Sequence, residues 1–379
     1  MDLAILRRQN IKEAKVEKMN ILYISHLSEN NSQGPNYSVP AQVQSQSEED
    51  NVFWWNLTEA RQQWWLDTGL FHGIKEFPKK KIALLPKPFD RPDLVVFESF
   101  YYLDDAILSF ECHQRGIPYI VVPRSALTRQ AQDNKRLKKF LGNSLLFSRM
   151  TKHALAIQYL TEKEYMDSGD RWCKNHFIIP NGIAPQDSVR IIEGHTFNGV
   201  YIGRFDSYQK GLDLLLEACV MCKEELEENG VTISLYGPER FGYREIFIKK
   251  VQENSLGNIL LVADGVFGDE KRKILKKADF FIMTSRFEGM PMSLIEAMSY
   301  GIPCLVTKGS NMAEIIEEHN AGWGCRTEVT DIVDAFKRMI SDRDRFSEIS
   351  NNAYELSKEY NWDKIARETH DIYEKLLSR

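Results

Sequence analysis

The chain has 379 residues, 43% of them hydrophobic, so it can bury a sizeable core, and its length favours two domains. Its 49 basic and 54 acidic residues give a formal charge of −5, which argues against a general polyanion binder and against nucleic acid as a partner. No apolar run approaches the roughly 18 residues that span a bilayer. The leader is too polar for a secretory signal, so we expect a cytoplasmic protein whose six cysteines are reduced.

The first half of the chain is expected to form an α/β domain over residues 19–183, after an N-terminal extension at 1–18. The expected strands are 20–25, 93–97, 118–122 and 154–158, with a helix at 103–115. Pro180 and Asn181-Gly182 break this pattern, so we place the domain boundary after them.

The second half alternates strands and helices more regularly and predicts a second α/β domain over 184–361. The expected strands are 198–203, 231–236, 258–263, 278–284 and 302–307, and the expected helices are 211–228, 243–254, 269–277, 291–299 and 311–319. This alternation is typical of a doubly wound parallel sheet covered by helices. A last helix in 362–379 has its apolar residues largely on one face, so it must pack against another part of the chain.

The segment 278–303 combines a buried strand, a loop and the start of a helix at Pro291. Ligands of open α/β sheets bind beyond the carboxyl ends of the strands, and the free N–H groups of a helix start suit a diphosphate or sugar hydroxyls. Glu288 and Glu296 could each accept two vicinal hydroxyls, one pair from a sugar and the other from a ribose. A solvated Glu296 on a helix surface is the alternative.

A second cluster follows the strand at 198–203. Gly203-Arg204 ends that strand and Lys210-Gly211 opens the next helix. A guanidinium and an ammonium at the mouth of the same sheet could neutralise a departing diphosphate. Two exposed loop cations are the alternative interpretation.

The two clusters together carry a resemblance to a known family. Arg286-Phe-Glu-Gly-Met-Pro-Met-Ser-Leu-Ile-Glu-Ala-Met-Ser-Tyr-Gly-Ile-Pro303 resembles the signature of the family-four retaining glycosyltransferases, in which two glutamates flank seven residues. Gly203-Arg204 and Lys210-Gly211 resemble that family's phosphate-binding pair. Pro180-Asn-Gly182, Asp264-Gly-Val266, Ala278-Asp279 and the helix from Trp362 occur in its order and spacing. The resemblance covers about residues 178–379 specifically and the first half loosely.

The resemblance implies a GT-B fold, with two Rossmann-like domains that face each other across a cleft and a final helix that crosses back to the first domain. It implies transfer of a sugar, with retention of configuration, from a nucleotide-diphospho-sugar, and no required metal or other cofactor. In that scheme an oxygen of the donor phosphate is the base, so the protein contributes mainly electrostatic stabilisation. We expect a UDP-sugar, because uridine is frequent in such enzymes.

The resemblance also assigns roles to residues of this sequence. Glu296 would bind the ribose and Glu288 the transferred sugar, while Arg204 and Lys210 would stabilise the leaving diphosphate beside Gly203. Main-chain N–H groups in 289–293 would hold sugar hydroxyls and phosphate, namely those of Gly289, Met290, Met292 and Ser293. The nucleobase would lie near Gly237, Pro238, Val266 and Phe267.

The first domain departs from the family pattern at two places. The loop after its first strand contains one glycine, Gly34, which permits close approach to a phosphate or an acceptor, although an ordinary loop would fit as well. Many relatives carry a histidine where this sequence has Arg124. We favour a contact between Arg124 and the donor sugar or diphosphate, with a structural ion pair as the alternative.

Three other features have competing interpretations. The basic and apolar stretch 124–153 could lie on an anionic bilayer at the inner face of the plasma membrane, or it is a solvated helix with a core-facing stripe. The pairs Trp54-Trp55 and Trp64-Trp65 could stack on sugars or pack in the core. Asp342-Arg-Asp344 spells a metal-binding pair of another glycosyltransferase fold, but its place among helices favours helix-surface charge.

The sequence therefore favours a retaining glycosyltransferase that moves a hexose to a saccharide or lipid-linked saccharide in polysaccharide biosynthesis. One alternative is a protein that binds sugar nucleotides without turnover. Another is a GT-B epimerase or phosphorylase.

Overall fold

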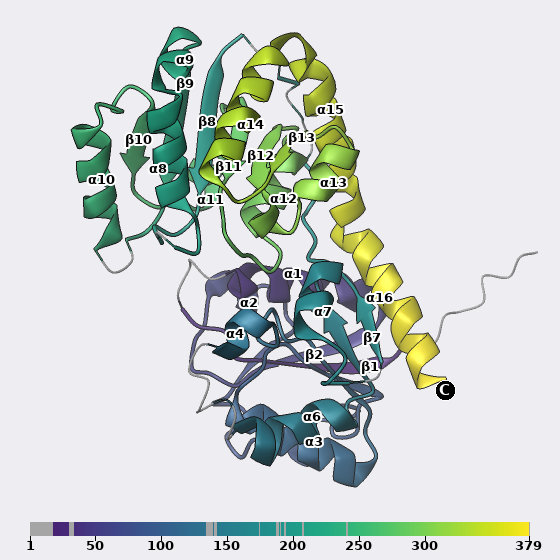
Figure 1. The fold of residues 1–379 in the computed structure, drawn as a ribbon. Coiled ribbons are helices and arrows are strands. Elements are labelled where there is room, and N and C mark those ends of the chain that lie inside the picture. The colour runs from purple at the N-terminus through teal and green to yellow at the C-terminus, as the bar shows by residue number, and fades with distance from the viewer. Residues whose placement is uncertain are drawn as a thin grey trace, which may run out of the picture.

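The computed structural model of the chain describes residues 18–29, 34–133, 139, 142–173, 175–186, 189, 191–192, 195–206, 208–239 and 242–378. These residues form two lobes, each built on a parallel β-sheet, and a long last helix that runs from the upper lobe down the side of the lower one (Figure 1). The expected extension at 1–18 lies outside the described residues except for Lys18.

The first lobe contains a seven-stranded sheet in the order β3-β2-β1-β4-β5-β6-β7. Its strands are β1 (Asn20–Ser25), β2 (Asn51–Asn56), β3 (Phe71–Gly73), β4 (Leu94–Phe97), β5 (Tyr119–Val121), β6 (Ala156–Tyr159) and β7 (His176–Ile178). Its helices are α1 (Pro35–Glu49), α2 (Gln63–Leu66), η1 (Ile82–Leu84), α3 (Leu103–Arg115), α4 (Arg129–Asp133), η2 (Asn143–Phe147), α6 (Ser148–His153) and α7 (Glu162–Ser168). All strand pairs are parallel, and the order of the strands reverses between β1 and β4.

The second lobe contains a six-stranded parallel sheet in the order β10-β9-β8-β11-β12-β13. Its strands are β8 (Phe197–Ile202), β9 (Val231–Tyr236), β10 (Leu260–Ala263), β11 (Phe280–Met283), β12 (Cys304–Thr307) and β13 (Gly322–Cys325). Its helices are α8 (Leu212–Met221), α9 (Lys223–Glu228), α10 (Tyr243–Glu253), α11 (Gly268–Leu275), α12 (Met292–Ser299), η3 (Lys308–Ser310), α13 (Ala313–Glu318), α14 (Val329–Ser341), η4 (Arg343–Arg345), α15 (Phe346–Ser357) and η5 (Lys358–Tyr360). The strand order reverses between β8 and β11.

Local sequence explains where these elements begin and end. Helix α3 has Asp104 and Asp105 in its first turn, which complement the helix dipole, and it ends at Gly116, whose φ of 64° suits glycine. The expected helix at 211–228 is divided into α8 and α9, because Cys222 leaves helical geometry with a φ of −117°.

The final helix α16 (Trp362–Leu377) crosses back and packs on α1 of the first lobe, as expected. Asn361 caps its start, accepting a hydrogen bond from the Asp363 N–H at 2.7 Å. His370 Nδ1 lies 2.9 Å from Asp50 Oδ1, and the Tyr373 hydroxyl donates to Gln158 Oε1 at 3.2 Å. These contacts join the end of the chain to the first domain.

The chain crosses between the domains twice, and the two crossing segments touch. The Ile183 N–H donates to the Tyr360 carbonyl at 2.6 Å, and Ile183 forms a parallel bridge with Asn361. A Cβ on Gly182 would lie 2.5 Å from the Trp362 ring, so glycine is needed for this close packing. One apolar cluster continues from the first sheet into the second, while two others cover the remaining faces of the sheets.

Among the described residues, none of the helices is both long enough and apolar enough to cross a bilayer. The two doubly wound α/β domains and the returning last helix are confirmed as the architecture. The carboxyl ends of the strands near each reversal of strand order define where a ligand would bind.

Candidate active site

The second sheet places both predicted clusters at its reversal of strand order. Residues 203–211 follow β8 and residues 284–291 follow β11, and these two strands are neighbours. The loops therefore leave the same edge of the sheet side by side. This is the position at which doubly wound folds bind ligands.

Lys210 and Glu288 form the centre of this edge. The Lys210 ammonium lies 2.7 Å from Glu288 Oε1, and their side chains are only 12% and 8% exposed. The Ser285 hydroxyl donates to the same carboxylate oxygen at 2.6 Å. The structure thus brings together a cation and a carboxylate that lie 78 positions apart in the sequence.

Close backbone packing fixes the position of this pair. Gly211 has a φ of 61°, and a Cβ there would lie 2.0 Å from the Thr284 carbonyl oxygen, so only glycine lets the two loops approach. Arg286 joins the same loops through two hydrogen bonds of 2.7 Å to the Asp213 carboxylate and one of 2.9 Å to the Tyr208 carbonyl. Asp213 is the main cause of the raised pKa of Arg286. Arg286 therefore positions the loops that carry Lys210 and Glu288.

The loop 285–291 leads into α12, which starts after Pro291 with no side-chain cap. The first intrahelical N–H groups are those of Leu294 and Ile295, which donate to the Pro291 carbonyl. The main-chain N–H groups predicted to bind sugar and phosphate, in 289–293, precede this first bonded turn. They lie where the positive end of the helix dipole favours an anion.

Glu296 occupies the second turn of α12 and is paired with Lys271 of α11. Both side chains are about one fifth exposed, at 19% and 21%. Glu288 and Glu296 are therefore each held by a lysine from another element. The arrangement offers one carboxylate before the helix start and one after it, which suits a ligand with hydroxyl groups at both ends of an anionic centre.

Arg204 lies on the loop that carries Lys210, and its direct partner is a neutral side chain. Its Nη2 donates to Gln209 Oε1 at 3.3 Å, and Gln209 also donates to the Phe287 carbonyl at 3.4 Å. The Arg204 carbonyl accepts the Tyr201 hydroxyl at 2.9 Å. Arg204 thus belongs to the loop that faces 285–288, with its guanidinium bound to Gln209.

The four residues predicted around a nucleobase also come from one edge of the sheet. A Cβ on Gly237 would lie 1.9 Å from the Gly203 carbonyl oxygen, and one on Gly265 would lie 3.1 Å from Pro238. Val266 is buried and Phe267 is exposed. The loops after β8, β9 and β10 therefore pack together, with the Phe267 ring left accessible to a ligand.

In the first domain, Arg124 lies in a buried polar network rather than in open space. Its Nε and Nη2 donate to Glu98 Oε2 at 3.1 and 2.7 Å, and its Nη1 donates to Ser38 and Asn181 at 3.1 and 3.2 Å. A further bond of 3.2 Å goes to Gln42. These contacts match the ion-pair alternative, and a contact between Arg124 and the donor stays a prediction.

The first and second domains meet next to Arg124. Ser125 Oγ lies 2.5 Å from the place where Gly289 would carry a Cβ, so glycine permits this contact. The Asn181 N–H approaches Met290 Sδ at 3.1 Å. Gly34 starts α1, and its carbonyl accepts the N–H groups of Tyr37 and Ser38 at 3.0 Å. The carboxyl edges of the two sheets therefore face each other across the loop 285–291.

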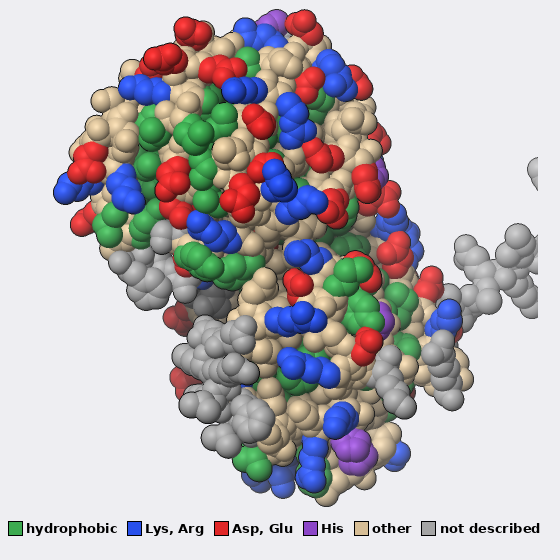
Figure 2. Space-filling view, viewed as in Figure 1, with side chains coloured by type: hydrophobic (Ala, Val, Ile, Leu, Met, Phe, Trp, Pro, Cys, Tyr) green, Lys and Arg blue, Asp and Glu red, His purple; other side chains and the backbone are tan. Residues whose placement is uncertain are grey.

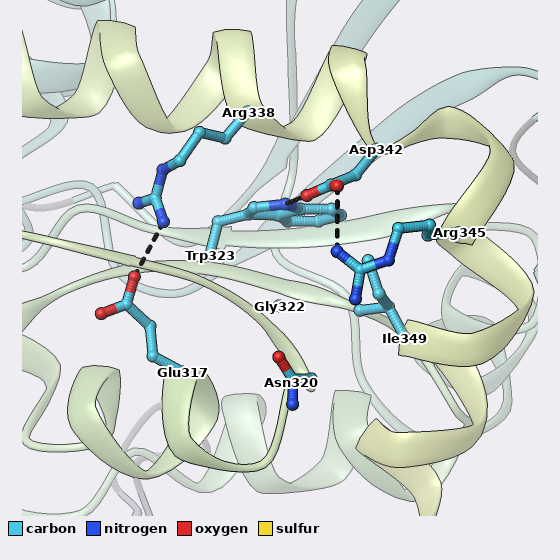
Figure 3. A pocket seen from close by; sticks show the side chains of 8 residues that line it. All are labelled: Glu317, Asn320, Gly322, Trp323, Arg338, Asp342, Arg345 and Ile349. Atoms are coloured by element: carbon cyan, nitrogen blue, oxygen red, sulfur yellow. Dashed lines mark hydrogen bonds and ion pairs between the residues drawn. The ribbon is translucent and has the colours of Figure 1, made fainter.

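A separate hollow of about 180 Å³ lies elsewhere in the second domain (Figure 3). It is lined by Glu317, Asn320, Gly322, Trp323, Arg338, Asp342, Arg345 and Ile349. Figure 3 shows Asp342 between the Trp323 indole, which donates to it at 2.9 Å, and Arg345 at 3.2 Å. Asp342 is thus a structural acceptor at the end of α14. Since Gly322 begins β13, this hollow is at the opposite end of the strands from Lys210.

Several residues of the site were not identified from the sequence. Lys271, Ser285 and Asn311 hold the two glutamates and their loop, the last by donating to the Gly289 carbonyl at 3.0 Å. No short motif marks them. Among the described residues, no group of three His, Cys, Asp or Glu side chains is placed to hold a metal ion.

Residues 194–356 match the family model of glycosyl transferases group 1. An uncharacterized glycosyltransferase from Methanocaldococcus jannaschii is 26% identical over 69% of both chains. A second such protein from that organism is 28% identical over 50% of this chain and 46% of its own length. A glycogen synthase from Desulfitobacterium hafniense is 26% identical over 44% of this chain, and that alignment spans 37% of the synthase. The matched region contains Glu288 and Glu296, each of which pairs with a lysine.

Solved structures show the same fold. The Anabaena protein HepE in complex with UDP and glucose superposes with a TM-score of 0.71 at 15% identity, over 94% of this chain and 100% of HepE. A sucrose-phosphate synthase from Thermosynechococcus elongatus gives 0.70 at 17% identity, over 95% and 100%. Both likenesses extend over the two domains and confirm the GT-B architecture. Residues 194–356 therefore belong to the group 1 glycosyltransferases, and the protein is a transferase enzyme with the GT-B fold.

Proposed function

We propose that the protein is a retaining glycosyltransferase that transfers a hexose from a UDP-sugar to a saccharide or lipid-linked saccharide in polysaccharide biosynthesis. The observation that carries this proposal is the pairing of Glu288 with Lys210 and of Glu296 with Lys271 on the two sides of the α12 start. Both pairs lie within the region that matches the family model.

In this function each group has a defined task. The Lys210 ammonium and the Arg204 guanidinium neutralise the diphosphate as it leaves, while Glu288 accepts hydroxyls of the transferred sugar. Glu296 accepts the two ribose hydroxyls, and the N–H groups before α12 bind phosphate oxygens. These groups bind, orient and neutralise charge, so a donor phosphate oxygen can take the acceptor proton and no protein nucleophile is required.

The UDP preference has support from relatives of the same fold, since HepE was solved with UDP and glucose. The direct test measures nucleotide release from UDP-, GDP- and ADP-sugars in the presence of saccharide acceptors. We expect release from a UDP-sugar and a product that keeps the anomeric configuration of the donor in its proton NMR spectrum. A protein that binds sugar nucleotides without turnover would gain thermal stability but release none. An epimerase or phosphorylase would change the sugar or need free phosphate.

The assignment of Glu296 to the ribose has its own test, because inorganic pyrophosphate offers the diphosphate of UDP without the ribose. Glu296→Gln should weaken UDP binding by about tenfold, since one charge-assisted contact is lost, and should leave binding of inorganic pyrophosphate unchanged. Glu270→Gln is the matched control, as this acidic residue lies in the exposed first turn of α11. Equal losses for UDP and pyrophosphate would contradict the assignment.

A contact between the first domain and an anionic bilayer is part of the proposal for lipid-linked acceptors. In 124–153, the residues 134–138, 140 and 141 lie outside the described part, but Leu145 and Leu146 are exposed. Leu103, Ile107 and Phe110 also leave an apolar stripe open on α3, which contacts α6. Figure 2 shows basic side chains over the visible face of the lower lobe.

Exposed apolar residues among cations suit the surface of an anionic membrane. We therefore expect the protein to sediment with phosphatidylglycerol vesicles and not with phosphatidylcholine vesicles, and Ile107→Asp to abolish the association. Sedimentation that Ile107→Asp does not alter would reject this surface.

A further inference from the structure

Two exposed aromatic rings lie together on the first domain. All seven tryptophans fall in the described part of the chain, and six of them are buried. Trp64 of α2 is the exception at 36% exposure, and its neighbour Tyr37 of α1 is 39% exposed. Their ring centroids are 5.7 Å apart with an interplanar angle of 17°. Nearly parallel rings at this distance are offset, so parts of both remain accessible.

Buried neighbours hold this pair in place. Trp65 Nε1 donates to the Asn36 carbonyl at 3.2 Å, which joins the residues next to Trp64 and Tyr37. The Asn36 side chain in turn donates to the Ser28 carbonyl at 2.7 Å, and Trp65 packs on Trp54 with centroids 5.8 Å apart. The two outer rings are therefore presented by anchored backbone, and a ligand that binds them loses little to ordering the protein.

The pair lies on the side of the first domain that faces the second. Helices α1 and α2 follow β1 and β2, so their first residues lie at the carboxyl edge of the sheet. Figure 1 shows α1 along the upper side of the lower lobe, facing the upper lobe. Burial and then the negative charge of Glu296 raise the pKa of the Tyr37 hydroxyl, so this ring lies within electrostatic reach of α12.

We propose that Tyr37 and Trp64 form a stacking surface for a pyranose ring of the acceptor saccharide. The inference rests on the proposed transferase function and adds a ring-binding subsite to it. A pyranose has a face lined by C–H bonds that packs on an aromatic ring, while its hydroxyls stay at the rim. Side-chain amides lie beside the rings, since Gln62 accepts from Trp64 Nε1 at 2.6 Å and Gln63 donates to Asp67 Oδ1 at 2.8 Å.

The chemistry of this surface suits a neutral sugar better than the donor. The diphosphate needs cations and helix N–H groups, and these lie on the second domain around Lys210 and α12. An oligosaccharide acceptor has several rings, of which only the terminal one reacts. A stacking surface for another ring increases acceptor affinity without touching the reacting atoms.

The exposure of Trp64 provides a direct assay. Iodide should quench the fluorescence of Trp64 selectively, and the Trp64→Phe variant identifies that component. We expect methyl pyranosides of glucose, galactose, mannose and N-acetylglucosamine, tested at millimolar concentrations, to include at least one that protects Trp64 from iodide. UDP alone should not protect it, and Tyr37→Ala should reduce the protection. Protection by UDP and by none of the pyranosides would assign the rings to the nucleobase and overturn the proposal.

Transfer kinetics separate this inference from the proposed function. Trp64→Ala should raise the acceptor KM by about tenfold, as expected for the loss of one stacking partner, with the donor KM and donor hydrolysis unchanged. Trp64→Phe should retain most of the affinity. Tyr354→Ala, which removes a half-buried ring on α15, is the control. An unchanged acceptor KM in Trp64→Ala overturns the subsite, whereas absence of transfer in the unaltered protein counts against the transferase function and leaves the iodide assay to decide the subsite.

Discussion

Lys210→Met removes the ammonium that pairs with Glu288 and tests the central contact of the site. The methionine side chain keeps a similar length and apolar stem, so the change acts mainly on charge. Lys210 and Glu288 are 12% and 8% exposed, so little water can replace the lost partner. In the variant the carboxylate keeps the Ser285 hydroxyl at 2.6 Å as a donor.

The expected loss of stability follows from the geometry of the pair. Two unit charges 2.7 Å apart attract by about 6 kcal/mol at an effective dielectric constant of about 20, and desolvation of both groups offsets much of that. Removing one partner leaves a charge with incomplete compensation, so we expect the free energy of unfolding to fall by about 2–4 kcal/mol. Lys210→Met combined with Glu288→Gln removes both charges and should restore stability to within about 1 kcal/mol of the original.

Activity should behave differently from stability. Both variants lack one of the two cations that we propose to neutralise the diphosphate, so kcat should fall by about 100- to 1,000-fold in each. Urea unfolding and nucleotide release from a UDP-sugar measure the two effects. Lys308→Met, in the exposed Lys308–Glu314 pair at 57% and 74% exposure, is the control and should change stability by less than about 1 kcal/mol. Unchanged turnover in Lys210→Met would refute the catalytic role, and a double variant as unstable as the single one would refute the account of the pair.

Two further predictions concern the fold around the site. Gly182→Ala places a Cβ 2.5 Å from the Trp362 ring, so we expect a loss of about 1–3 kcal/mol in urea unfolding, and full stability would show that the crossing segments are not closely packed. Burial raises the pKa of Asp105, which His26 contacts at 2.8 Å, above its ordinary value of 3.8. The folded chain therefore keeps that proton to higher pH than the unfolded chain, and the resulting stability is lost as the pH rises through the raised pKa. Asp105→Asn should flatten this decline, and an identical pH dependence of the urea midpoint in both proteins would contradict it.

The strands that the sequence indicated correctly are those with continuous apolar runs. Strands β3 and β7 have three residues each and contain His72 and His176, so neither is a continuous apolar run, and β13 contains two glycines in Gly322–Cys325. The sequence does not indicate β2, because its adjacent Trp54 and Trp55 fit either a ring surface or core packing, whereas both are fully buried in a strand beside β1. Trp64 is exposed and Trp65 is buried, and the sequence alone does not distinguish these two adjacent tryptophans.

The residue types of the site were predictable, but their partners were not. Glu288 and Glu296 stand out by their spacing and by the resemblance of their segment to a family signature. That Lys210 and Lys271 pair with them depends on how β8, β10 and β11 bring distant loops together. Arg124 shows the same limit, since its main partner Glu98 lies 26 positions away on another loop. The position of a basic residue in the sequence does not indicate which acidic residue it pairs with in the folded protein.

The ion pair between Lys210 and Glu288 has a consequence for the proposed reaction. A free ammonium would attract any diphosphate, but Lys210 already binds Glu288 at 2.7 Å. A ligand must therefore replace the contact between these two side chains with contacts of its own, rather than fill an open site. An intact UDP-sugar can satisfy both partners at once, because a phosphate oxygen takes the ammonium while sugar hydroxyls take the carboxylate. UDP alone takes the ammonium and leaves Glu288 with the Ser285 hydroxyl. The pair therefore favours the donor over the nucleotide product, which is the preference that a transferase needs to release UDP after each transfer.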